Sequence, residues 1–92
     1  MSKDVYKRLL EQNGLDNQLT VAIEEYSELI KELTKTLRNK SNKMKLIEEL
    51  ADVEIVNEQL MQNFSITRKQ IDLFKKFKLN RLEEFYLKEN EK

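Results

Sequence analysis

The sequence has 92 residues, enough for one domain, and it contains no cysteine and no histidine. These absences exclude a disulfide framework, a thiolate or imidazole metal site, and a thiol or imidazole catalyst. Any metal site must use oxygen ligands, which suit Mg²⁺ or Mn²⁺. The 17 basic and 17 acidic side chains cancel, so no net charge attracts nucleic acid or an anionic membrane. No apolar run reaches the roughly 20 residues of a membrane span, and we expect a cytoplasmic protein.

The distribution of helix-breaking residues predicts a chain that is helical almost throughout. There is no proline, and the single glycine, Gly14, marks a stop after Asn13. The polar residues 38–42 are the expected loop between two long helices. The predicted helices are one over 3–12 with Ser2 as its N-cap, one that Asp16 or Asn17 caps, one over 43–64, and one that begins at Ser65 or Thr67 and reaches the charged tail 88–92.

The order of these helices predicts an all-α fold in which one short and three long helices form an antiparallel bundle. Thr67 and Gln70 have the spacing of a capping box at the start of the last helix. A chain of this size buries only a modest fraction of its surface. We therefore expect residues 1–92 to form a single domain whose core is completed by homo-oligomerisation, as a dimer or a tetramer.

Apolar residues recur at helical spacing in the second and third predicted helices. Steps of three and four residues place such residues on one face, and that face is expected to form the core. The apolar residues are Ile23, Tyr26, Ile30, Leu33 and Leu37 in the second helix, and Leu46, Leu50, Val53, Val56, Leu60 and Phe64 in the third.

Five carboxylates accompany these apolar faces. Glu24, Glu25 and Glu28 lie on the second helix, and Glu49 and Asp52 lie on the third. Residues three or four positions apart are neighbours on a helix, so two antiparallel helices are predicted to bring the acidic pairs together. On the helical wheel Glu49 falls within the apolar arc of its helix, and Asp52 lies at the edge of that arc.

Two interpretations of these carboxylates are open. Glutamate pairs on helices are most often solvated, and for any single pair that is the more common case. An ionised carboxylate on a core face, however, costs free energy unless it is paired or bound to a metal. Clustered carboxylates also repel one another until one of them protonates. A divalent cation removes both costs, so the cluster as a whole indicates a metal site.

The fourth predicted helix carries two cations, Lys78 and Arg81, on its apolar face. In one interpretation their long stems pass over the apolar surface to reach water. Two cations at adjacent turns, in a chain with an acidic cluster, favour a second interpretation in which they bind phosphate oxygens. Lys75 and Lys76 are interpreted as solvated. The apolar residues of this face are Ile71, Phe74, Leu82 and Phe85.

The segments Glu24-Glu25-x-x-Glu28 and Glu49-x-x-Asp52 together resemble the motif of a known family. This is the MazG-like branch of the all-α nucleoside triphosphate pyrophosphohydrolases, especially the short forms common in phages and their bacterial hosts. The flanking residues at 22–23, 48 and 50–53, and the segment 78–81, are also similar to that family. The resemblance covers roughly residues 18–85.

The resemblance implies a Mg²⁺-dependent hydrolase, with Mn²⁺ as a substitute, that converts an NTP or dNTP to the monophosphate and pyrophosphate. It implies that Glu25, Glu28, Glu49 and Asp52 hold the metal, and that Glu24 joins them or orients the attacking water. In a chain without histidine, a carboxylate such as Glu24 is the natural proton acceptor.

The resemblance also implies that Lys78 and Arg81 contact the phosphates of the substrate, whose base and sugar stay unassigned. The alternative is a non-catalytic helical module that binds nucleotide or a protein partner. A third hypothesis keeps the enzyme class and makes the protein a narrow dUTPase or dCTPase. No nucleic acid partner is expected, since there is no basic stripe with interleaved aromatic residues. Candidates for a base pocket, for which ordinary packing explains the tyrosines equally well, are Tyr6, Tyr26, Asn57 and Gln59.

Overall fold

The computed structural model describes residues 2–87, and in that range the chain is all-helical, as expected. It contains α1 (Ser2–Leu37), α2 (Lys43–Asn63) and α3 (Arg68–Leu82), followed by one π-helical turn, η1 (Glu83–Leu87). The predicted tail 88–92 lies outside the described residues. Within the described range, no helix combines the length and the apolar character that a membrane span requires.

The element α1 consists of the two predicted N-terminal helices, which meet at a kink. Gly14 has φ 81° and ψ 164°, which are not helical values, and the helix continues on both sides of it. Glycine tolerates positive φ because it has no Cβ. The predicted break after Asn13 is therefore confirmed as a kink at Gly14, with a helix on each side of it. Ser2, expected as a cap, is already the first residue of α1.

The segment of α1 before the kink contacts the C-terminal half of α2. The Tyr6 hydroxyl donates a hydrogen bond of 2.8 Å to Glu58 Oε2, and Tyr6 is buried. The Gln62 Nε2 amide donates a second hydrogen bond, of 3.0 Å, to the Lys3 carbonyl oxygen. Because α1 is kinked at Gly14, the part before this residue and the part after it both pack on α2.

Local capping interactions set the starts of α2 and α3. The side chain of Asn42 accepts a hydrogen bond of 3.1 Å from the backbone N–H of Lys45, and α2 begins and ends within one residue of its predicted bounds. Thr67 and Gln70 form the predicted capping box, with reciprocal hydrogen bonds of 3.1 and 2.9 Å. Thr67 is therefore the cap of α3, and Ser65 is not.

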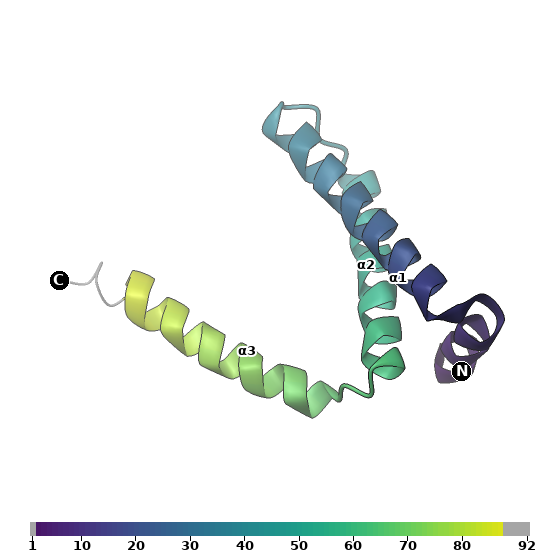
Figure 1. Ribbon diagram of the computed structural model, residues 1–92. Helices are drawn as coiled ribbons and strands as arrows, with labels where there is room; N and C mark the ends of the chain where they lie inside the picture. The colour runs from purple at the N-terminus through teal and green to yellow at the C-terminus, as the bar shows by residue number, and fades with distance from the viewer. Residues whose placement is uncertain (1, 88–92) are drawn as a thin grey trace.

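The long part of α1 lies antiparallel beside α2, whereas α3 projects away from both helices (Figure 1). We call the α1–α2 pair the hairpin. The radius of gyration is 17.0 Å, against about 12 Å for a compact domain of this length. One chain therefore does not close the expected bundle of three long helices, and its completion by a second copy stays a prediction.

The face that α1 turns toward α2 is not the predicted apolar face, and this part of the prediction is wrong. Between the kink and its C-terminus, α1 buries Gln18, Ala22 and Glu32. Ile23 and Ile30, which were expected in the core, are 65% and 62% exposed. The α1 side of the seam thus consists of small and polar residues, and the apolar stripe of α1 faces outward.

The predicted apolar face of α2 is only partly buried. Val56 is 3% exposed, but Leu50 and Phe64 are 47% and 49% exposed. The buried apolar residues of the described chain are Tyr6, Ala22 and Val56 alone. A core of this size leaves much apolar surface without a partner within the chain.

Candidate metal centre

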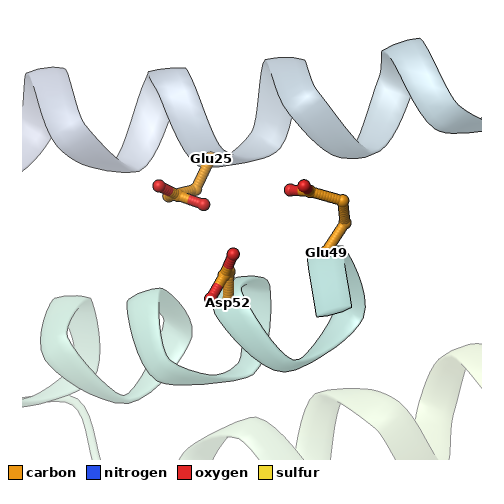
Figure 2. A group of neighbouring side chains, drawn as sticks. All are labelled: Glu25, Glu49 and Asp52. Carbon is orange, nitrogen blue, oxygen red and sulfur yellow. The ribbon is translucent and has the colours of Figure 1, made fainter. Parts of the chain in front are cut away.

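Three of the predicted ligands meet between the two helices of the hairpin. Glu25 comes from α1, and Glu49 and Asp52 come from successive turns of α2. Figure 2 shows their side chains pointing toward one another across the gap between the helices. One carboxylate oxygen from each lies within 4.8 Å of the other two. The three-residue spacing on α2 and the antiparallel pairing with α1 together produce this cluster.

Glu49 is the buried member of the cluster. It is 3% exposed, and its Oε1 lies 3.2 Å from the Lys45 ammonium nitrogen. Its Oε2 is buried and has no hydrogen-bond partner. A buried carboxylate oxygen without a partner costs free energy, because it has lost its hydration and gained nothing in return. The cluster therefore has an unused oxygen ligand.

The surroundings of Glu25 change the pKa of its carboxyl group. Burial raises the pKa of the Glu25 carboxyl above its usual value, and the negative charges of Asp52 and Glu49 raise it further. Contact with Asp52 and the charge of Glu28 add to the same effect, so Glu28 lies near the cluster although it is exposed. A divalent cation would offset this repulsion between carboxylates. The donor atoms are all oxygens, which are the hard ligands that Mg²⁺ prefers.

Two charged residues beside the cluster, Lys45 and Glu32, were not predicted from the sequence as neighbours of the site. Lys45 pairs with Glu49, and this contact together with the charge of Glu48 raises the pKa of the Lys45 ammonium group. Glu32 is 3% exposed and pairs with Lys35 at 3.3 Å. Lys45 lies four residues before Glu49, and Glu32 lies seven residues after Glu25, so helical spacing was the signal that would have found both.

The other predicted site residues lie apart from the three carboxylates. Glu24 is exposed on α1 and is not part of the cluster. Lys78 and Arg81 line a surface pocket of α3 and η1 together with Leu82 and Phe85. Because α3 projects away from the hairpin (Figure 1), one chain does not bring these cations to the acidic cluster.

Three of the candidate base-pocket residues, Tyr6, Tyr26 and Asn57, form hydrogen bonds within the hairpin. The Tyr26 hydroxyl donates a hydrogen bond to Asn57 Oδ1, which joins α1 to α2. Tyr6 is held by Glu58, and this hydrogen bond, with burial, raises the pKa of the Tyr6 phenol. These contacts give both tyrosines a packing role.

Comparisons with known proteins found no relative. No family model matches the chain, and neither a curated protein nor a solved structure matches it. The resemblance to the MazG-like family therefore stays a prediction from the motif. The functional assignment rests on that motif and on the geometry of the carboxylates.

Proposed function

We propose that this protein is a cytoplasmic, Mg²⁺-dependent nucleoside triphosphate pyrophosphohydrolase, with Mn²⁺ as a substitute cation. The observation that carries this proposal is the cluster of Glu25, Glu49 and Asp52, in which Glu49 Oε2 is buried without a partner. The Lys45 ammonium group pairs with the other oxygen of Glu49 and balances only part of the negative charge of these three carboxylates. A purely structural seam between two helices would gain stability from apolar residues there.

Each residue of the proposed site has its own role. Glu25, Glu49 and Asp52, with Glu28 nearby, would hold the cation. When bound, Mg²⁺ supplies positive charge to phosphoryl oxygens and lowers the pKa of water. Glu24, which is exposed and precedes Glu25 in the sequence, would accept the proton of the water that attacks the α-phosphorus. The bond from the α-phosphorus to the bridging oxygen then breaks, and pyrophosphate leaves with that oxygen.

Lys78 and Arg81 complete the proposed site by binding the remaining phosphate oxygens. They reach the acidic cluster only if α3 approaches a hairpin, from the same chain or from another copy. The proposal therefore includes a homo-oligomer, a dimer or a tetramer.

A substrate panel tests the chemistry. The protein is incubated with Mg²⁺ and each common ribo- and deoxyribonucleoside triphosphate, and pyrophosphate and monophosphate are measured separately. We expect equal release of both products, and near-total loss of turnover in Glu49→Gln with helicity retained. The ranking of bases also separates a broad enzyme from a narrow dUTPase or dCTPase. Full activity in Glu49→Gln, or no release from any triphosphate by the folded protein, would contradict the proposal.

A non-catalytic interaction module is the second candidate, and the extent of exposed apolar surface favours it. The two candidate functions predict different results when Mg²⁺ and a hydrolysable triphosphate are added to the protein. A ligand that binds only the native state raises the melting temperature. A module that binds nucleotide shows this rise and leaves the triphosphate intact, whereas the hydrolase shows the rise with a non-hydrolysable analogue and consumes the natural substrate.

A further inference from the structure

Glu32 is a buried carboxylate of α1 that the proposed chemistry does not use. It is 3% exposed, as is Glu49, and it lies on the face of α1 that packs against α2. Among residues 2–87 its one charged partner is Lys35, whose ammonium nitrogen lies 3.3 Å from Glu32 Oε1. The side chain of Lys35 is 38% exposed, so water screens this ion pair. A buried carboxylate with such a partner gains free energy when a further cation approaches it.

The register of the hairpin places Lys45 of α2 level with Glu32. Glu25 and Asp52 meet across the two antiparallel helices, with carboxylate oxygens within 4.8 Å of each other. Glu32 follows Glu25 by seven residues, which is two helical turns or about 10 Å along α1. The same step along α2, in the opposite direction, leads from Asp52 back to Lys45. Seven residues also return to the same face of a helix, so Lys45 lies opposite Glu32 as Asp52 lies opposite Glu25.

The Lys45 ammonium group has three carboxylates around it. Its nitrogen lies 3.2 Å from Glu49 Oε1 and 3.7 Å from Glu48 Oε2. The hydrogen bond to Glu49 is the largest of the effects that raise the pKa of this group, and the charges of Glu48 and Glu32 add to it. Lys45 thus pairs with Glu49 and also interacts with the charge of Glu32. The stem of a lysine is flexible, so rotation about its bonds can move the ammonium group between neighbouring carboxylates.

We propose that Glu32 is the second acceptor of Lys45 and receives its ammonium group when a divalent cation binds at Glu49. The cation takes over the negative charge with which Lys45 pairs, and the two positive charges then repel each other. Glu48 is the competing acceptor, but its side chain is 64% exposed, so water weakens its attraction for the ammonium group. Glu32 is buried and attracts this group more strongly. It is therefore a positioning residue, which holds Lys45 away from the cation without contacting the cation itself.

This inference rests on the cation site of the proposed function, but its first test needs no metal. Glu49→Gln removes the negative charge with which Lys45 pairs, and in this respect it imitates a bound cation. Glu32→Gln and Lys45→Gln are introduced singly and together, both into the wild type and into Glu49→Gln. Urea unfolding in chelator then measures the equilibrium constant of each protein. We expect the coupling between positions 32 and 45 to be larger by roughly threefold or more in the Glu49→Gln background.

Glu48→Gln, the same chemical change at the competing acceptor, replaces Glu32→Gln in the matched control cycle. Its coupling to position 45 is expected to increase less, because Glu48 is solvated. Equal coupling of positions 32 and 45 in both backgrounds would overturn the proposal, as would a larger increase for position 48. If Glu32→Gln does not fold, Glu32→Asp takes its place in the cycle, since it keeps the charge and only shortens the side chain.

Calorimetric titration with Mn²⁺ tests the same transfer with the cation. We expect Glu32→Gln to bind Mn²⁺ about threefold more weakly than the wild type, because the displaced ammonium group has lost its acceptor. In the Lys45→Gln background the same substitution should weaken binding less. An equal effect in both backgrounds would show a role for Glu32 that does not involve Lys45, and would overturn the proposal. No Mn²⁺ binding by the folded wild type would contradict the proposed cation site instead, and the unfolding cycles would still decide whether Lys45 transfers.

Discussion

The Lys45 ammonium nitrogen lies 3.2 Å from one oxygen of the Glu49 carboxylate, while the other oxygen of Glu49 is buried without a partner. The lysine is therefore an internal counter-charge that balances only part of the acidic cluster. It neutralises the side of Glu49 that faces the N-terminus of α2 and leaves Glu25 and Asp52 to repel each other. A divalent cation and Lys45 compete for the same negative charge.

Lys45→Gln is predicted to tighten Mn²⁺ binding and to destabilise the metal-free protein. Removing the ammonium group increases the negative potential at the cluster, and because the side chain is 41% exposed, the gain in affinity is about twofold to fivefold. Calorimetric titration with Mn²⁺ measures the affinity, and thermal unfolding in chelator measures the stability. Lys31→Gln, the same charge change on an exposed part of α1, is expected to alter neither quantity. Weaker Mn²⁺ binding in Lys45→Gln would show that the lysine orients Glu49 instead.

The raised pKa of Glu25 predicts a specific pH dependence of stability. In the window between the ordinary value of 4.5 and the raised value, the native state holds a proton that the unfolded state has lost. The free energy of unfolding of the metal-free protein therefore falls as pH rises through this window. Cation binding displaces the same proton, so metal affinity rises with pH over the same range.

Urea unfolding at a series of pH values in chelator measures this dependence. Glu25→Gln should lose the Glu25 part of the slope and should be more stable than wild type above the window. Glu24→Gln, the same chemical change on an exposed neighbour, is the control and should keep the wild-type slope. If the two variants share one slope, the charges around Glu25 do not govern it.

Features that depend on neighbouring residues along the chain could be predicted from the sequence. The start of α2 at Lys43 and the Thr67–Gln70 capping box depend on residues within one helical turn. The grouping of Glu49 and Asp52 with Glu25 needed only helical spacing and one antiparallel pairing. Such short-range rules depend little on the rest of the fold.

Which face of each helix packs against its neighbour could not be predicted in the same way. Periodicity identifies the apolar stripe of α1 through Ile23 and Ile30, but it does not say which surface covers that stripe. In this chain the seam with α2 is made by Ala22 and Glu32, and the stripe faces outward. The direction of α3 is also not set by local sequence, because few contacts join it to the hairpin.

Gly14→Ala is predicted to destabilise the protein through the backbone alone. Nothing lies within 4 Å of the position that a Cβ would occupy, so no clash is created. At φ 81° and ψ 164°, however, an L-residue with a side chain is strained, at a cost of roughly 1–3 kcal/mol. Thermal unfolding measures the loss, and Asn13→Ala, one residue earlier in helical backbone, should be neutral or stabilising. Unchanged or higher stability of Gly14→Ala would show that α1 can straighten and release Tyr6 from Glu58.

Arg81→Gln is predicted to weaken triphosphate binding by roughly tenfold, because a hydrogen bond between charged groups is lost. Mn²⁺ affinity without nucleotide should be unchanged, since α3 projects away from the carboxylates in one chain. Titration of a non-hydrolysable triphosphate with Mg²⁺ measures the first quantity, and Lys76→Gln on the same helix is the control. Arg81→Lys should recover part of the affinity, because lysine keeps the charge but lacks the planar fork. Wild-type affinity in Arg81→Gln would mean that α3 does not approach the acidic cluster, and that other cations hold the phosphates.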